Sequence, residues 1–359
     1  MISQKQLTDL ERERAEKCVQ RESGLELFRI LTMMLIIAHH YVVNSGLIDV
    51  IFADPLNTKS IFLLLFGAWG KTGINCFLLI TSYFMCKSEI TMKKFLKLII
   101  QVEFYKIIFF AIFTISGYTA FNYKNLFKAV VPIWNMQQNF TSCFLIFFLC
   151  IPFLNILVRN MTEKQHRNLL ALVGLFYIFL GSIPKFHISF NYVTWFCIIY
   201  FIGSYLRLYP IQLFENKKAR IALFIGSVLI STISILIFHY IGFKYDKHLW
   251  DFWLADSNKI LAVVTSVNAF VFFKYLKIPY NKFINTVAST TFGVLLIHAN
   301  SDTMRQWLWK DFLNNVGNFQ HNGNIYLHAI LSVIGIFVVC SILDYLRIKV
   351  FAITIEKKL

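Results

Sequence analysis

Charged residues are scarce in this sequence: they make up 15% of the 359 residues, whereas hydrophobic residues make up 57%. An ordinary soluble domain is about 25% charged and about 45–50% apolar. Proline is also rare, with six residues, so little interrupts the long apolar stretches. The composition excludes an ordinary soluble domain and predicts an all-α, polytopic membrane protein.

Several sequence motifs of common enzyme classes are absent. There is no P-loop, dinucleotide-binding fingerprint, zinc motif or serine-hydrolase elbow. This weighs against an ATP-driven pump and a conventional hydrolase. The seven cysteines are scattered, mostly in apolar segments, and lack metal-ligand spacing. We therefore interpret them as small membrane-buried residues and predict no metal.

The apolar runs are continuous and near the length of about 20 residues that a helix needs to cross a bilayer. Continuous runs also disfavour a β-barrel, whose strands alternate. A cleavable signal peptide is not expected, because the first run lacks a small-residue cleavage site before a soluble domain. We predict about ten transmembrane helices, at 25–43, 72–86, 95–118, 142–157, 169–183, 192–206, 219–240, 260–273, 283–299 and 325–346. The apolar stretch SIFLLLFGAW before the second helix is either a half-buried external segment or an extension of that helix.

Basic residues test this topology. The net charge of +16 would suggest a nucleic-acid partner in a soluble protein. Here 23 of the 35 Lys and Arg residues fall in the segments predicted to be cytosolic and ten in the outer segments, a bias typical of membrane orientation. We therefore predict both termini in the cytosol, the lipid bilayer as a partner, and no nucleic acid. The expected domains are a charged leader (1–20), a single transmembrane domain (21–350) and a short tail (351–359).

The first predicted span carries Glu26 and Arg29 near its start and His39 and His40 deep inside. Polar and titratable groups in an apolar span are costly and indicate a functional site. Arg29 and His40 are eleven residues apart, so about 1100° of helix rotation brings them within roughly 20° of one face, about 16 Å apart along the axis.

His40 is the leading catalytic candidate, because histidine transfers protons near neutral pH and acyl transfer to a hydroxyl needs a base. The alternative is a core histidine bonded to a neighbouring helix. His39 points roughly 100° away and is expected to pack or support. Arg29 could bind a phosphate or carboxylate of an acyl donor, or anchor the cytosolic end as an ion pair with Glu26.

A second basic group, Lys94 and Lys97 with Lys93, stands at the cytosolic start of the third span. It could hold the phosphates of a nucleotide-like donor, or consist of lysines that reach the interface for topology. Deeper in the same span, Glu103 and Lys106 are expected to neutralise one another and to be structural unless they line a cavity.

The ninth span ends in His298 and is followed by Arg305, Trp307 and Trp309. The aromatic residues are typical of a membrane-interface belt. Alternatively, tryptophan and arginine together could stack on and hydrogen-bond a sugar at the outer face. We therefore name His298, Arg305 and Trp307 as candidate acceptor-binding residues.

These motifs together resemble acyltransferase family 3, membrane proteins that O-acylate bacterial surface carbohydrates. Arg29, ten residues and His40 match the family's first span, with Glu26 where aspartate is frequent. GINCFLLITSYF resembles the second span, with Ser82 where glycine is usual, and KKFLK resembles the third, with lysines where arginines are common. IPFLN, YFIGSYLR and TFGVLLIH resemble later segments, so the similarity covers roughly residues 21 to 350.

The resemblance implies an acyl-CoA donor, usually acetyl-CoA, and an acceptor hydroxyl on a surface glycan or its lipid-linked precursor. It also implies roles in activity for Arg29 and His40, with Glu26 beside them, and a location in the bacterial plasma membrane. A transporter of lipid-linked oligosaccharide or a glycan polymerase is the main alternative, since many spans with intramembrane charges suit both. An inactive sensor on the same fold is a third interpretation, disfavoured by the intact Arg29 and His40 pair.

Overall fold

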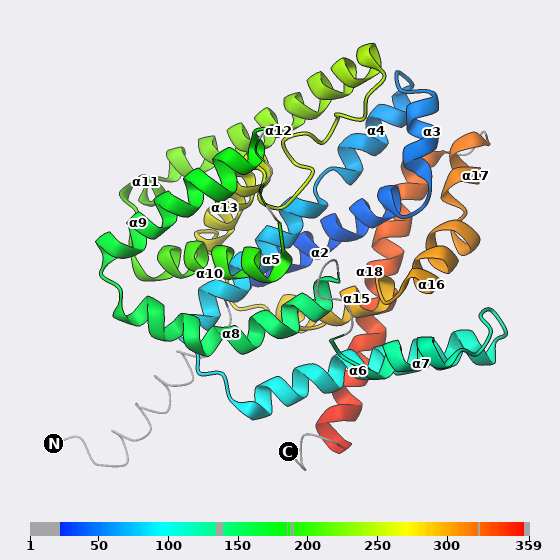
Figure 1. The fold of residues 1–359 in the computed structure, drawn as a ribbon, viewed down its shortest axis with the longest axis horizontal. Helices are drawn as coiled ribbons and strands as arrows, with labels where there is room; N and C mark the ends of the chain where they lie inside the picture. Colours follow the sequence, from blue (N-terminus) through cyan, green and yellow to red (C-terminus); the bar gives the residue numbers. More distant parts are fainter. Residues whose placement is uncertain are drawn as a thin grey trace.

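The computed structural model describes residues 22–133, 139–184, 186, 188, 190–321 and 324–354, and its regular elements there are all helices (Figure 1). The predicted leader and residues 355–359 of the predicted tail lie outside this part of the chain. The bounds of the helices are α2 Ser23–Val43, α3 Leu47–Ala53, α4 Thr58–Gly67, α5 Gly70–Met85, α6 Met92–Ile115, α7 Tyr123–Val130, α8 Phe140–Asn160, α9 Glu163–Val173, η1 Gly174–Phe179, η2 Leu180–Ser182, α10 Tyr192–Leu208, α11 Gln212–Glu215, α12 Lys217–Tyr245, α13 Ile260–Lys274, α14 Lys282–Ser289, α15 Thr291–His298, α16 Asp302–Arg305, η3 Gln306–Phe312, α17 Asn315–Gln320 and α18 Ile325–Thr354.

The all-helical fold class is confirmed, and each of the ten predicted apolar segments coincides with helical structure. Within the described residues, six helical stretches are long and apolar enough to cross a membrane: Ser23–Val43, Thr58–Met85, Met92–Ile115, Phe140–Asn160, Lys217–Tyr245 and Ile325–Ile353. Tyr192–Leu208 and Ile260–Lys274 are shorter apolar helices. The count of ten spans and the cytosolic termini stay predictions.

The second candidate span includes the stretch whose role the sequence left open. Helix α4 begins at an Asn57 cap, whose side chain accepts a hydrogen bond from the Lys59 backbone N–H, and α5 follows after a two-residue turn. The apolar stretch therefore extends the second span at its N-terminal end, in line with one of the two interpretations.

Helix α2 lies at the centre of the bundle, beside α4, α5, α13, α14 and α18 (Figure 1). Leu25, Met33 and Ile37 on this helix are fully buried. Phe28 stacks on Phe273 of α13 with 4.6 Å between ring centroids. The first span is thus surrounded by protein, which is where polar side chains in a membrane protein find partners.

The close packing of α5 against α10 depends on small residues. A Cβ added to Gly203 of α10 would lie 2.6 Å from the Ser82 Cβ of α5. Ser82 satisfies its own hydroxyl by donating to the Leu78 carbonyl at 2.6 Å. Small residues let helix backbones approach closely in a membrane, so Ser82 fits where a larger side chain would separate the two helices.

Hydrogen bonds fasten both ends of α2 to the C-terminal third of the chain. At its start, the Asn281 backbone N–H donates to Ser23 Oγ at 2.9 Å. At its far end, the Tyr41 hydroxyl is hydrogen-bonded to His328 Nδ1 of α18 at 2.7 Å, and Asn315 donates to the Tyr41 carbonyl at 3.0 Å. The first span is therefore held in register with helices formed by the last quarter of the sequence.

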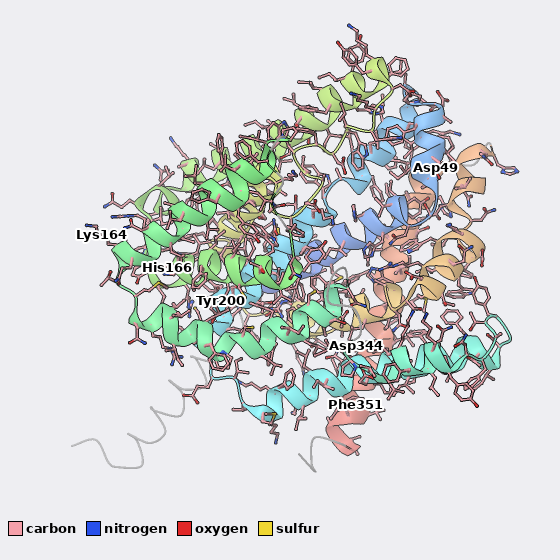
Figure 2. All side chains as sticks on the ribbon, in the orientation of Figure 1. Asp49, Lys164, His166, Tyr200, Asp344 and Phe351 are labelled. Atoms are coloured by element: carbon pink, nitrogen blue, oxygen red, sulfur yellow. The ribbon has the colours of Figure 1, made fainter. Side chains whose placement is uncertain are left out.

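Helix α18 crosses α6, and a buried ion pair marks the crossing (Figure 2). The Asp344 carboxylate accepts from Arg347 Nε at 2.7 Å and from the Tyr105 hydroxyl of α6 at 2.7 Å. Further along, Phe104 meets Phe351 edge to face at 5.0 Å. Asp344 is fully buried and sits where a Cβ on Gly293 of α15 would lie 2.0 Å from it, so Gly293 makes room for the carboxylate.

Candidate functional site

The centre of the candidate site is a pair of histidines from two distant helices. His40 Nδ1 in α2 lies 3.0 Å from His298 Nε2 at the end of α15. The other ring nitrogen of His298, Nδ1, lies 2.6 Å from the Val294 carbonyl one turn back in its own helix. His298 is fully buried, whereas His40 keeps some accessible surface.

This chain of hydrogen bonds assigns the protons of the neutral pair. A carbonyl oxygen only accepts, so His298 Nδ1 carries the hydrogen and its Nε2 presents a lone pair. His40 Nδ1 must then donate to His298 Nε2, which leaves His40 Nε2 unprotonated. That atom has no hydrogen-bond partner among the described residues. The neutral pair thus leaves a lone pair on His40 Nε2.

His40 lines a cavity of about 590 Å³ at the end of α2 that we predict to face outward. Its walls come from α2, α5, α6, α7, the start of α8 and the α15–α16 region. Side chains that can hydrogen-bond a sugar line it: Thr119, Asn125, Asn139, Thr141, Ser142, Asn300, Ser301 and Thr303. The aromatic rings of Phe110, Phe113, Phe140 and Tyr192 line it as well.

His39 supports this wall from the neighbouring side. Its Nδ1 donates to the Gly67 carbonyl at 2.7 Å, in the turn between α4 and α5. A Cβ on Gly70 would lie 2.1 Å from the His39 ring, so the ring rests directly on the backbone of α5. His39 also lines the cavity. Its packing agrees with the support role expected from the sequence.

The residues predicted to bind the donor lie elsewhere. Glu26 is buried and pairs with Arg29, whose Nε is 3.7 Å from Glu26 Oε2, so this expected ion pair is present. Neither residue lines the cavity of His40. Lys94 is exposed and donates to the Glu89 carbonyl at 2.6 Å, and Lys97 is half-buried one turn further along α6. These groups therefore belong to the opposite end of the bundle from His40.

The predicted acceptor residues separate into three positions. His298 joins His40, and Arg305 lines the cavity, where its Nη1 donates to Asp302 at 3.0 Å. Trp307 does not line the cavity: it stacks on Phe312 with 5.3 Å between ring centroids and meets Phe113 edge to face.

Trp309, rather than Trp307, is the tryptophan beside the histidine pair. It is fully buried and meets His298 edge to face with 6.4 Å between ring centroids. It also meets Tyr41 edge to face at 6.1 Å, so it fills the space between α2 and α15. The π-helix η3 carries both tryptophans, and its wider turn places them differently from an α-helix.

Three lysines line the cavity. Lys106 pairs with Glu103 at 3.4 Å as expected and lines the cavity, which is the case in which the sequence left a functional role open. Lys71 and Lys128 line the same space, and both were counted among the outer charges. For Lys71 the signal that could have singled it out is its place within the candidate span Thr58–Met85, since a lysine within a span indicates function by default; Lys128 lies in α7, outside the candidate spans, and gave no such signal.

Together these observations define a helical membrane protein with a hydrogen-bonded histidine pair at the wall of a polar cavity. The profile of the acyltransferase domain of family 3 matches residues 22–345, nearly the whole chain. The protein belongs to this family and is a membrane acyltransferase. No curated protein and no solved structure matches the chain significantly.

Proposed function

We propose that this protein transfers an acetyl or similar short acyl group from acyl-CoA to a hydroxyl of a surface or capsular polysaccharide, or of its lipid-linked precursor, in the bacterial plasma membrane. The observation that carries the proposal is the hydrogen-bond chain from His40 through His298 to the Val294 carbonyl, beside a cavity lined by hydrogen-bonding side chains. A base within hydrogen-bond reach of the acceptor hydroxyl is what acyl transfer to an alcohol requires.

In the proposed reaction, His40 Nε2 first accepts a proton and later returns it. The acceptor hydroxyl gives its proton to His40 Nε2 while its oxygen forms a bond to the acyl carbon. The tetrahedral intermediate then collapses, the C–S bond breaks, and the CoA thiolate takes up the proton. The imidazolium formed on His40 is stabilised through its Nδ1–H, which stays bonded to His298 Nε2 at 3.0 Å.

Arg29 would hold or orient the donor at the cytosolic side, together with Lys94 and Lys97. Its guanidinium is already oriented by Glu26, and a fixed fork of donors suits a phosphate or carboxylate. Arg29 and His40 are about 16 Å apart along one helix. The donor and the acceptor would thus approach α2 from opposite ends.

The decisive experiment gives membranes that contain the full chain labelled acetyl-CoA and an acceptor glycan, and then measures label on the glycan. We expect His40→Ala to reduce transfer by at least about 100-fold, as loss of a general base does. His321→Ala is the matched control, because His321 is exposed at the end of α17 and lies outside the cavity. Unaltered transfer by His40→Ala would contradict the proposed chemistry.

The same assay separates the proposal from lipid-linked oligosaccharide transport. A transporter moves its cargo without acyl-CoA, whereas an acyltransferase leaves a covalent label on the glycan. Comparing surface glycans of wild-type and deletion strains by NMR tests the acceptor directly: the proposal expects an O-acyl signal that disappears with the gene.

A further inference from the structure

The cavity of His40 is unusually rich in positive charge. Four basic side chains line it, each from a different helix: Lys71 from α5, Lys106 from α6, Lys128 from α7 and Arg305 from α16. The only carboxylate among its described lining residues is that of Asp302. Cations collected around a hollow attract anions and raise their local concentration.

Two of the four cations are already partnered by the protein. Lys71 donates to the Tyr192 hydroxyl at 2.9 Å and lies 3.5 Å from Asp256. Lys106 donates to the Val131 carbonyl at 2.7 Å and pairs with Glu103. These contacts hold the two ammonium groups in place and offset their charge, so binding of an anion falls to the other two cations.

The other two cations keep donors to spare. Lys128 is half-buried and makes no ion pair or hydrogen bond through its side chain among the described residues. Arg305 uses Nη1 for Asp302, whose side chain is 97% exposed. The Arg305 Nε is buried without a hydrogen-bond partner in the described part of the chain. A buried donor left unpaired costs free energy, and an acceptor that binds to it removes that cost.

We propose that the acceptor is an anionic glycan, whose carboxylate or phosphate is held by Lys128 and Arg305 while a hydroxyl is presented to His40. This inference rests on the proposed function and adds the chemical class of the acceptor. The neutral polar side chains of the cavity would bind the sugar hydroxyls, and its aromatic rings the apolar faces of the sugar. A guanidinium edge binds a carboxylate or phosphate through two parallel hydrogen bonds.

The test measures binding to the full-length protein in detergent, so it does not depend on turnover. The probes are two oligosaccharides that differ only by a glucuronate in place of a glucose, and a third arm uses a glycerol phosphate oligomer. We expect the acidic probe to bind at least about tenfold more tightly than the neutral one, as one added charge-assisted hydrogen bond supplies. The preference should shrink as salt rises from 0.1 M to 1 M, since the Debye length falls from about 10 Å to about 3 Å.

Substitutions of Lys128 test whether this residue is responsible for the preference for the acidic probe. Lys128→Gln should weaken binding of the acidic probe about tenfold, more than that of the neutral probe, and Lys128→Arg should restore it. Lys124→Gln is the matched control, because Lys124 lies on the same helix but does not line the cavity. If the glucuronate probe binds more tightly than the glycerol phosphate oligomer, the site prefers a carboxylate, and the reverse order shows a preference for phosphate. Equal affinity for these two anionic probes shows that charge alone is recognised.

Equal binding of acidic and neutral oligosaccharides would overturn the inference, and so would equal losses in Lys124→Gln and Lys128→Gln. The outcomes also separate the two proposals. If no acceptor is acylated but the charge preference and its loss in Lys128→Gln hold, the proposed function fails and the binding inference stands. If neutral glycans are acylated and bound as well as acidic ones, the function stands and the inference fails.

Discussion

His40 Nδ1 lies 3.0 Å from His298 Nε2, although 258 positions separate the two residues in the chain. The Val294 carbonyl, by accepting from His298 Nδ1, decides which ring nitrogen of each histidine carries hydrogen. A carbonyl in α15 therefore determines the chemical state of a side chain in α2.

Replacing His298 separates its positioning role from simple packing. We expect His298→Ala to lower acyl transfer about 100-fold, because His40 loses the acceptor that holds its tautomer. His298→Gln should recover a large part of the rate, since a glutamine oxygen can accept from His40 Nδ1. Equal loss in both variants, with the protein folded by size-exclusion chromatography, would contradict the role in orienting His40.

The contact between His39 and Gly70 predicts a pair of compensating substitutions. Gly70→Ala would force a Cβ to within 2.1 Å of the His39 ring, and overpacking of this kind costs about 1–3 kcal/mol. The apparent melting temperature in detergent should fall for Gly70→Ala and rise again in Gly70→Ala combined with His39→Ala. A double variant that is no more stable than Gly70→Ala would show that the ring contact is not the cause.

The Asp344 ion pair predicts a large loss of stability on truncation. Asp344→Ala leaves Arg347 without its carboxylate in a buried site, and removing one partner of a buried pair costs about 3–5 kcal/mol. Gly293→Ala should also destabilise the protein, because its Cβ would meet the same carboxylate at 2.0 Å.

Gly335→Ala provides the control for that pair. Gly335 lies in α18, the helix that carries Asp344. A Cβ added there meets nothing within 4 Å. An alanine is favoured over glycine inside a helix by about 0.5–1 kcal/mol, so this variant should melt at the wild-type temperature or slightly above. If Gly335→Ala were as harmful as Gly293→Ala, an added methyl group in a helix would explain the loss without the contact to Asp344.

Substitutions at the donor end should raise the KM for acyl-CoA and leave the KM for the glycan unchanged. We expect Arg29→Lys to raise the KM for acyl-CoA about tenfold, because lysine keeps the charge but not the fork. Lys94→Gln should change it less, since Lys94 is exposed and already bonded to the Glu89 carbonyl. A rise in the KM for the glycan rather than for acyl-CoA would place Arg29 on the acceptor side.

The sequence predicted the helices and the residues of α2 well, because both follow from local patterns. Long apolar runs locate helices, and a titratable group within such a run stands out. The Glu26–Arg29 and Glu103–Lys106 pairs are three residues apart and could also be predicted, since residues three apart share a helix face.

The partners of those residues could not be predicted in the same way. No local pattern connects His40 to His298, because their contact depends on how α15 packs against α2. The cavity is formed by segments far apart in sequence, so Lys71 and Lys128 look like topology charges until the helices are assembled. In the region of Trp307 and Trp309, a π-helix changes the rotation per residue, and α-helical spacing no longer tells which tryptophan faces inward.

The attachment of the first span to the last quarter of the chain has a consequence for biosynthesis. At about 5–20 residues per second, the ribosome needs roughly 13–52 s to add the 258 residues from His40 to His298. During that interval Glu26 and Arg29 already neutralise each other within one turn, whereas His40 waits for its partner. The His40–His298 pair therefore forms only as the C-terminal helices enter the bilayer, and a chain terminated before His298 lacks it.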